Sequence, residues 1–345
     1  MIQKSDNIFV TGGTGFIGSY ILRYLIDRGY TNVFALRRND SRMDLVQTIE
    51  DKVQWITGDI CDYFTLEDAL QGKDYIIHAA ALVSFQAADQ ERLHQINVEG
   101  TANLVNLAVD LGIKKLIHIS SIAAIGRKEE SNIIDEDVEW QRSKHNSNYA
   151  VSKYLAELEV WRGVSEGLSV AILNPANVLG SGFWAEGTAR TFLQIWNGFP
   201  FYTSGLTGYV DVRDVARCAV DMLHSAIQNE RFILSESDYT YQEIFRMIAE
   251  NLNRKTPATK VRHWMVPFAR MMDLLKSRIS GRRPFLSREI TRNAFQEWKY
   301  DSQRSREKLL LEYIPIEQTI RETAQQFIQA QKNNLAPAVL PLSKK

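Results

Sequence analysis

Short apolar segments alternate with amphipathic ones through the first half of the chain, and this alternation predicts the fold. Segments typical of buried strands cover residues 7–10, 33–36, 53–57, 75–79, 116–120 and 169–173. Between them, apolar residues recur at helical spacing, as over 19–28, 91–111 and 149–164, and Thr65 is a predicted N-cap for a helix over 66–70. Strands that alternate with helices are typical of α/β proteins, so we predict a doubly wound parallel sheet covered by helices.

The pattern changes near residue 177. Glycines, aromatic residues and short elements replace the regular alternation, and helices are then predicted over residues 213–227 and 316–330. We therefore expect a first domain over residues 1–176 and a smaller C-terminal lobe over 177–335, with some segments of the lobe returning to the main sheet. Residues 336–345 contain two prolines and end in Ser-Lys-Lys, which predicts a flexible end.

One further apolar segment lies in the C-terminal part of the chain, where Arg and Lys are frequent. Residues 264–275 carry Trp, Met, Phe and Leu in a helical pattern with basic residues nearby. We expect this face to pack against the lobe. The alternative is that it lies on a membrane surface or over a cleft.

Composition limits the classes of function. Of the 345 residues, 45% are hydrophobic, which is ample for a large core, and 41 basic residues balance 41 acidic ones. A formal net charge of zero gives no reason to expect nucleic acid or a strongly charged surface as a partner. Cys61 and Cys218 lie far apart and lack the spacing of metal ligands, so we expect reduced thiols, no metal site and a cytoplasmic protein. No apolar run approaches the roughly 18 residues that a membrane-spanning helix needs.

The first candidate site is the glycine-rich sequence between the first predicted strand and the first predicted helix. Gly12, Gly15 and Gly18 recur every three residues, with Phe16 and Ile17 among them. The first glycine permits a tight turn, the second lets backbone amides approach a phosphate, and the third lets the helix pack closely on its strand. Because the N-terminus of a helix attracts anions, this sequence predicts a site for the pyrophosphate of a dinucleotide. A plain flexible turn is the alternative.

The second candidate site combines a tyrosine, a lysine and a serine. Tyr149 and Lys153 are four residues apart and share one face of a predicted helix. The reference pKa of tyrosine is about 10, and a nearby ammonium lowers it by stabilising the phenolate. Ser121 follows a predicted strand, at the end of the sheet where α/β proteins bind ligands. Together these groups predict proton transfer to a carbonyl or from an alcohol. Taken alone, the tyrosine and the lysine are also typical of a pair on a helix surface, and the serine is also typical of a cap at a strand end.

The order of these motifs resembles the extended short-chain dehydrogenase/reductase family, also called the NAD-dependent epimerase/dehydratase family. The resemblance rests on Thr11-Gly12-x-x-Gly15-x-x-Gly18, Gly58-Asp59-Ile60, His78-Ala79-Ala80-Ala81, Asn97-Val98-x-Gly100-Thr101, Ser121 and Tyr149-x-x-x-Lys153. It continues through residues 174–180 and 209–216, and so covers most of the chain. The run 120–126 and the basic C-terminal part look most like the dihydroflavonol reductase and 3-beta-hydroxysteroid dehydrogenase branches. The family implies a Rossmann-type sheet and a homodimer, in which the helices of residues 97–111 and 149–164 pair into a four-helix bundle.

The resemblance also implies roles for single residues. Tyr149 is expected to be the acid/base, Lys153 to hold the nicotinamide ribose and tune Tyr149, and Ser121 to orient the reacting oxygen. Asp59 and Ile60 are expected to flank the adenine. The other implied cofactor contacts are Ala79, Ala80, Ala81, Pro175, Asn177 and Val178. Asn97 matches a family position for which a structural role is equally expected, and we interpret His78 as a strand-end histidine and not as a catalyst.

Charge at the end of the second predicted strand bears on the choice between NAD and NADP. NAD-specific sites place a carboxylate there for the ribose hydroxyls, whereas arginine suits a 2′-phosphate. This chain has Arg37 and Arg38 at that place, so we favour NADP over NAD. The alternative is that both arginines are solvated and Asp40 or Asp44 folds back.

We therefore expect an oxidoreductase that transfers a hydride between NADP(H) and a carbonyl or secondary alcohol of a small hydrophobic substrate. Candidate substrate residues are Val83, Ser84, Phe85, Phe183, Trp184 and Tyr209, with packing in the core as the alternative for each. A nucleotide-sugar epimerase that uses NAD is a second hypothesis, because Asn174 before Pro175 resembles a nucleotide-sugar contact. Sugar dehydration is disfavoured, since Ile122-Ala123 stands where dehydratases carry an acid pair. A catalytically silent dinucleotide-sensing scaffold is the third hypothesis, and the intact Ser, Tyr and Lys speak against it.

Overall fold

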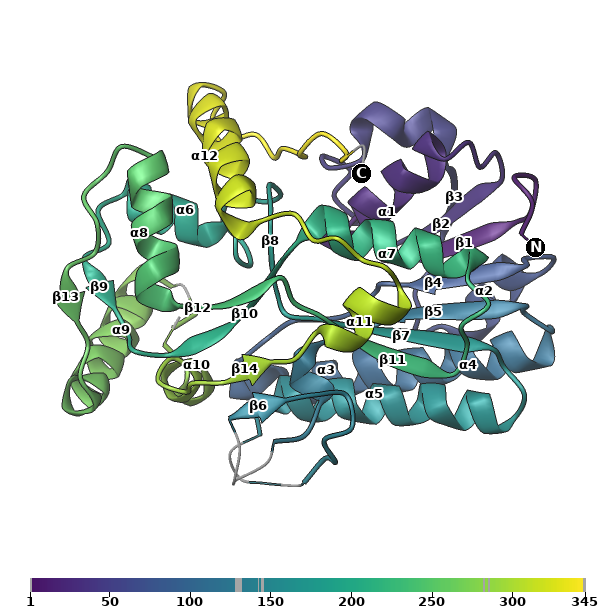
Figure 1. Ribbon diagram of the computed structural model, residues 1–345, viewed down its shortest axis with the longest axis horizontal. Helices are drawn as coiled ribbons and strands as arrows, with labels where there is room; N and C mark the ends of the chain where they lie inside the picture. Colours follow the sequence, from purple (N-terminus) through teal and green to yellow (C-terminus); the bar gives the residue numbers. More distant parts are fainter. Residues whose placement is uncertain are drawn as a thin grey trace.

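A seven-stranded parallel sheet forms the centre of the computed structural model, which describes residues 2–127, 132–141, 143, 146–281, 283–284 and 286–343 (Figure 1). Its strands are β1 (Ile8–Thr11), β2 (Val33–Arg37), β3 (Gln54–Thr57), β4 (Tyr75–His78), β5 (Lys115–Ile119), β7 (Val170–Pro175) and β11 (Glu230–Leu234). All six predicted strands are present, and the predicted fold class is confirmed. The order β11-β7-β5-β4-β1-β2-β3 reverses direction between β1 and β4, where α/β sheets bind their ligands.

Helices cover both faces of this sheet because its strands are apolar on both sides. Ile8 and Val10 belong to the core on one face and Phe9 to the core on the other. The first core contains α1 (Phe16–Asp27) and α7 (Val212–His224), and the second contains α2 (Tyr63–Leu70), α4 (Gly100–Asp110) and α5 (Asn148–Ser165). The second half of the chain thus contributes α7 and β11 to the first domain.

Two helices differ from their predicted form. The N-cap of α2 is Asp62 and not Thr65, because the Asp62 carboxylate accepts hydrogen bonds from the backbone N–H and the hydroxyl of Thr65. The long helix expected over 91–111 consists of α3 (Gln90–Leu93), the π-helical turn η3 (His94–Glu99) and α4. A π turn carries one extra residue, so it rotates the helix locally, and such turns are frequent at functional sites.

The lobe has a core of its own beside the carboxyl ends of the main strands (Figure 1). A three-stranded sheet is formed by β8 (Asn177–Leu179), β10 (Leu206–Asp211) and β12 (Ser237–Thr240). The lobe core is completed by α6 (Arg190–Trp196), α8 (Tyr241–Asn251) and α12 (Ile316–Lys332). The remaining elements are β6 (Ile133–Ile134), β9 (Phe201–Tyr202), β13 (Thr259–Lys260), β14 (Lys299–Tyr300), α9 (Val266–Ser280), α10 (Arg288–Asn293), α11 (Gln303–Lys308) and short 3₁₀ turns.

The C-terminal segment corrects the expectation of a flexible end. Leu340 is buried at 2% exposure, and its backbone N–H donates 2.8 Å to the Tyr20 hydroxyl on α1. The N–H of Ser343 donates in the same way to the Tyr24 hydroxyl at 3.1 Å. The prolines prevent a helix here, but they leave an extended segment whose apolar side chains cover α1. Met1, Lys344 and Lys345 lie outside the described residues.

Candidate active site

The glycine-rich turn joins β1 to α1 at the point where the sheet reverses direction. Gly12 has φ +71°, and a Cβ on it would lie 2.6 Å from the backbone nitrogen of Ala80, just after β4. A Cβ on Gly18 would lie 2.1 Å from the carbonyl oxygen of Gly12, so α1 packs directly on the turn. Gly15 is the N-cap of α1 and leaves the first turn without a side-chain cap or an acidic residue.

This turn fits a dinucleotide pyrophosphate. The uncapped N–H groups at the start of α1 and its helix dipole favour an anion. The nearest contact of a Cβ added to Gly15 would be the Gly12 carbonyl at 3.2 Å, so its missing side chain leaves room above the helix end. Phe16, by contrast, points into the protein, where its ring lies against Gly182 and edge-on to Tyr20.

Ser121 and Tyr149 meet at the carboxyl end of β5. Ser121 lies two residues after the last residue of β5 and caps a short 3₁₀ turn, its Oγ accepting from the N–H of Ala123 at 3.1 Å. Tyr149 lies in the first turn of α5, which begins after the N-cap Ser147. Burial raises the pKa of the Tyr149 phenol, and its hydrogen bond with the Ser121 side chain opposes that rise. The two predicted hydroxyl groups therefore lie side by side.

Lys153 lies one turn later on α5 and is almost completely buried. Its ammonium donates 3.0 Å to the carbonyl of Ile119, the last residue of β5. Burial lowers the pKa of Lys153 to about 8, and the negative charge of Glu157 opposes this change. The expected lowering of the Tyr149 pKa by Lys153 is not seen in this arrangement, because burial dominates at the phenol.

A buried polar network holds these groups from behind. Asn174, at 0% exposure on β7, donates 2.5 Å to Glu157 Oε1 and 3.0 Å to the Ser121 carbonyl. Glu157 Oε2 in turn lies 3.4 Å from an Arg231 guanidinium nitrogen on β11. Asn174 therefore connects β7, α5 and the segment that carries Ser121.

Asn97, in the π turn η3, acts as a clamp on the loop after β4. Its amide donates 2.9 Å to the Leu82 carbonyl, and its oxygen accepts from the Leu82 N–H at 2.7 Å. The same amide donates to the hydroxyl of Ser152, between the two catalytic candidates of α5. This loop carries Phe85, whose ring packs edge-on against Tyr149 with centroids 5.6 Å apart.

Two buried histidines lie beneath the site and are neutral. His78 lies 2.7 Å from the hydroxyl of Thr11 and 2.9 Å from that of Thr101, and burial lowers its pKa to about 3. The His118 ring lies 5.1 Å from the His78 ring, and burial also lowers its pKa. Neither nitrogen of His118 has a hydrogen-bond partner among the described residues. The strand-end interpretation of His78 agrees with this geometry.

The other predicted cofactor residues line the carboxyl edge of the sheet or pack beneath it. Arg37 ends β2, and its side chain makes no ion pair within the described ranges, whereas Arg38 pairs with Asp40 at 3.1 Å. Asp59 Oδ1 accepts from the N–H of Cys61, and Ile60 is buried against Gly100. The remaining members follow β4 (Ala79, Ala80, Ala81) or lie in β7 and β8 (Pro175, Asn177, Val178).

The predicted substrate residues separate into two groups. Val83 is 62% exposed, and it lies with Ser84 and Phe85 in the loop beside Tyr149. The Arg42 guanidinium lies over the ring of Phe183, with its central carbon 3.9 Å from the centroid of that ring. Trp184 and Tyr209 are buried in the lobe core, and Trp184 donates to the Ala336 carbonyl. The structure thus shows the packing role that was the alternative for both side chains.

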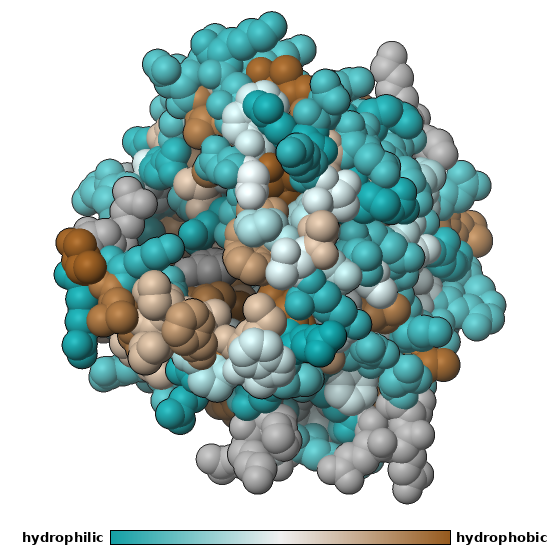
Figure 2. Space-filling view, turned by 90° about the vertical axis from the view of Figure 1, so that its left-hand side faces the viewer, coloured by the Kyte–Doolittle hydropathy of each residue, from teal (hydrophilic) through white to brown (hydrophobic). Residues whose placement is uncertain are grey.

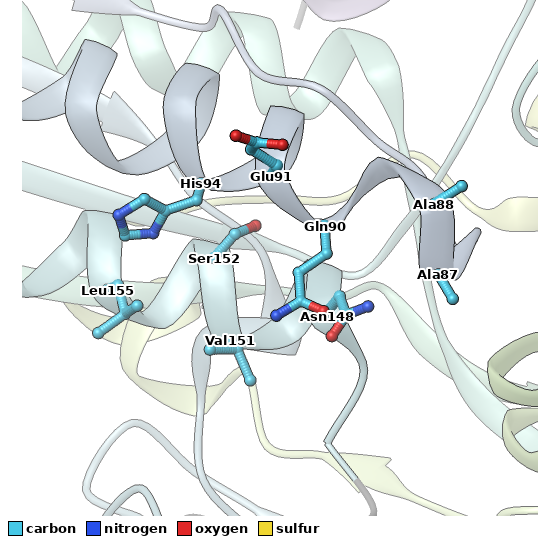
Figure 3. Close-up of a pocket in the computed structure, with 9 residues that line it drawn as sticks. All are labelled: Ala87, Ala88, Gln90, Glu91, His94, Asn148, Val151, Ser152 and Leu155. Atoms are coloured by element: carbon cyan, nitrogen blue, oxygen red, sulfur yellow. The ribbon is translucent and has the colours of Figure 1, made fainter.

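A groove of about 520 Å³ lies along α5 (Figure 3). It runs between the segment of residues 87–94 and α5. Its lining residues are Ala87, Ala88, Gln90, Glu91, His94, Asn148, Val151, Ser152 and Leu155. Tyr149 and Lys153 are not among them.

Sequence reasoning did not identify Glu157, Ser152 or Arg231 as part of the site. For Glu157 a signal was available, because it lies four residues after Lys153 and therefore on the same helical face. Arg231 gave no such signal, since only the pairing of β11 with β7 brings it to Glu157.

Comparisons with known proteins agree with this fold. A profile of the NAD dependent epimerase/dehydratase family matches residues 8–234. A protein of Synechocystis sp. that is named as a dihydroflavonol 4-reductase is 30% identical over 335 residues, covering 94% of this chain and 96% of that protein. Sterol demethylase protein B of Methylococcus capsulatus is 28% identical, covering 87% and 92%. The crystal structure of gox2253 superimposes with a TM-score of 0.80 at 28% identity, covering 94% of this chain and 98% of the other.

Proposed function

This chain belongs to the NAD-dependent epimerase/dehydratase family and is an NAD(P)-dependent enzyme, and we propose that within the family it is a reductase or dehydrogenase. It transfers a hydride between NADP(H) and the carbonyl or secondary alcohol of a small hydrophobic substrate. Tyr149 is the acid/base, Ser121 orients the reacting oxygen, and Lys153 supports the phenol.

The observation that carries the proposal is the meeting of Ser121, Tyr149 and Lys153 at the end of β5, beside the glycine-rich turn. Because Tyr149 and Ser121 are hydrogen-bonded to each other, one substrate oxygen can contact both hydroxyls. The phenol donates a proton to that oxygen during reduction and accepts it during oxidation. Bound nicotinamide supplies or accepts the hydride. With a pKa of about 8, Lys153 is mostly protonated at neutral pH, and its positive charge stabilises the negative charge that develops on the phenol as the proton is donated.

The preference for NADP rests on Arg37. Its guanidinium ends β2 without an ion pair in the described part of the chain, so it remains available to a 2′-phosphate. Arg38 is less available because it is paired with Asp40. Asp40 therefore neutralises the neighbouring arginine.

A hydrophobic substrate is supported by the loop beside Tyr149 and by the relatives. Exposed Val83 and the ring of Phe85 offer an apolar wall next to the phenol. The two similar proteins are named for a dihydroflavonol and a sterol, both of which are built on fused rings. The epimerase hypothesis has less support, because the amide of Asn174 is fully buried and bonded to Glu157 and Ser121.

The test uses the purified chain with NADPH and a panel of aldehydes and ketones that ranges from small polar to large aromatic compounds. We expect NADPH to be oxidised, fastest with the apolar aromatic ketones. Interconversion of nucleotide sugars without net NADPH consumption would replace this proposal by the epimerase hypothesis. Binding of NADPH without turnover of any compound would replace it by the scaffold hypothesis.

We also propose that two copies pair through α4 and α5, as the family resemblance implies. Leu158 on α5 is 44% exposed, and the groove of Figure 3 is open along the same helix. Light scattering after size exclusion checks this, and a mass of one chain would contradict it.

A further inference from the structure

Helix α9 (Val266–Ser280) presents large apolar side chains to solvent. Phe268 is 63% exposed and Ile279 is 88% exposed, and Met271, Met272 and Leu275 are also exposed. Trp264, in the turn before the helix, is 74% exposed. Figure 2 shows hydrophobic side chains gathered on this side of the molecule. The expectation that this face packs against the lobe is therefore wrong.

Five of the exposed apolar residues of α9 form one stripe, and Leu274, which is 48% exposed, lies beside it. The members of this stripe recur from turn to turn at a spacing of three or four residues, and so lie on one side of the helix; they are residues 268, 271, 272, 275 and 279. Residues 260–281 contain five basic residues and one acidic residue, Asp273. Asp273 accepts from the Leu286 N–H at 2.7 Å and does not face solvent freely. Lys276 and Arg278 are exposed and lie on either side of the stripe by helical spacing.

Neighbouring strands extend this apolar surface. Phe199 and Phe201 are partly exposed, with ring centroids 5.7 Å apart. Phe201 begins β9, which pairs with β13 shortly before Trp264. Contiguous exposed apolar surface of this kind marks interaction sites, and an exposed tryptophan is typical of membrane interfaces.

We propose that α9 and Trp264 dock this chain onto a membrane surface that contains anionic lipids. The apolar stripe enters the boundary of the acyl chains, and Lys276 and Arg278 contact headgroup phosphates. The excess of basic residues favours this partner over a second copy, because a symmetric contact through the same face would bring like charges together. In the described part of the chain, no helix combines the length and apolar character needed to cross a bilayer, so docking is to the surface.

The position of α9 connects the docking surface to the active site. Arg283, just after the helix, pairs with Asp89 at 3.0 Å, and Asp89 accepts from the hydroxyl of Ser84 at 2.7 Å. Gln86 donates to the Pro284 carbonyl at 2.7 Å. These bonds hold the end of α9 to the loop whose Phe85 covers Tyr149. If the proposed function holds, a membrane-dissolved hydrophobic substrate is brought beside this loop, whereas docking itself does not depend on that function.

Sedimentation with lipid vesicles tests the docking. The probes are vesicles of phosphatidylcholine alone and vesicles with about one-third phosphatidylserine, at low and high salt. We expect binding to the anionic vesicles and at least a tenfold loss of partitioning for Phe268→Asp/Ile279→Asp and for Lys276→Glu/Arg278→Glu. The matched controls are Phe64→Asp, exposed on α2, and Lys52→Glu/Lys332→Glu, which should bind as the unchanged chain does.

Three outcomes would overturn the proposal. The first is that the unchanged chain does not bind anionic vesicles. The second is that binding survives both double substitutions in α9. The third is that the chain binds no vesicles and forms a dimer that the Phe268→Asp/Ile279→Asp substitution dissociates. Circular dichroism of each variant shows that it is folded. NADPH oxidation with a water-soluble ketone, measured without vesicles, reports on the proposed function alone and so separates its failure from a failure of docking.

Discussion

Asn174 donates a 2.5 Å hydrogen bond to the carboxylate of Glu157, four residues after Lys153 on α5. The same amide also donates to the Ser121 carbonyl. The position of Ser121 is therefore coupled to the negative charge of Glu157, which acts on Lys153. Glu157 is the acidic group that raises the pKa of Lys153 against the effect of burial. Glu157 is therefore a positioning residue for the site.

Replacing Glu157 by Gln is expected to shift the pH profile of the enzyme. The substitution keeps the side-chain size but removes the negative charge. The pKa of Lys153, which burial has already lowered to about 8, therefore falls further. The alkaline limb of kcat/KM should move to lower pH, and the KM for NADPH should change little. Glu159→Gln, at a surface ion pair with Arg162 on the same helix, is the control. An unchanged pH profile would show that Glu157 acts only in folding.

Tyr149→Phe is expected to lower kcat by about 10²- to 10⁴-fold, because it removes the proton donor and leaves the ring. Binding of NADPH, followed by its fluorescence, should remain. Lys153→Ala should reduce both turnover and cofactor affinity. Tyr154→Phe is the control, since its ring stacks on Trp140 away from the site. Near-normal turnover of both Tyr149→Phe and Lys153→Ala would refute the proposed mechanism.

Gly18→Ala is expected to destabilise the fold, whereas Gly15→Ala should affect mainly cofactor binding. A Cβ at Gly18 would meet the Gly12 carbonyl oxygen at 2.1 Å, and the backbone must move to relieve this overlap. Overpacking of this kind costs about 1–3 kcal/mol in the free energy of unfolding. At Gly15 the nearest contact is 3.2 Å, so the fold tolerates the methyl group, which instead fills the space above the helix end. Urea unfolding and NADPH titration of both variants separate the two effects.

Arg37→Glu is expected to reverse the cofactor preference. A hydrogen bond between charged groups contributes about 1.5–3 kcal/mol, so the Kd for NADPH should rise about 10- to 100-fold while that for NADH does not rise. Arg38→Ala should have a smaller effect because Arg38 is already paired with Asp40. If both variants bind NADPH as the unchanged chain does, the 2′-phosphate contacts neither arginine.

His118→Phe is expected to improve stability in acid. Burial lowers the folded-state pKa of His118 well below 6.5, so between these values the unfolded chain binds more protons and the free energy of unfolding falls as the pH falls. The loss is at most about 1.4 kcal/mol per pH unit. Urea unfolding between about pH 7 and pH 4.5 should show a shallower decline for the variant. An equal change in His94→Phe, at an exposed site, would exclude this cause.

Local signals explain which parts of the fold could be predicted. Most of the predicted strands are short and mainly apolar, and the glycine spacing marks the β1–α1 turn. The catalytic candidates could also be identified, because Tyr149 and Lys153 share a helical face and Ser121 lies just beyond the carboxyl end of a strand. In each case residues near in sequence determine the result.

Other features depend on contacts between distant segments and could not be predicted. Trp184 resembled a cleft residue because it lies among glycines, yet the rings of Phe192 and Phe327 enclose it. The N-cap of α2 is an exception, because its cause is local: Asp62 lies three residues before Thr65, and its carboxylate accepts the free N–H of Thr65. The exposed stripe of α9 has the same apolar pattern as a buried one, and sequence alone does not show which side is covered.

The contact between Leu340 and Tyr20 joins residues 320 positions apart. The tyrosine hydroxyls of α1 can find these backbone partners only in a chain that includes residues 340–343. A contact of such sequence separation has a large loop-closure entropy, so we expect it to form late in folding. The helix that carries the dinucleotide turn thus takes part of its polar contacts from a segment about 320 residues later in the sequence, and we expect a chain that lacks residues 336–343 to hold α1 less firmly.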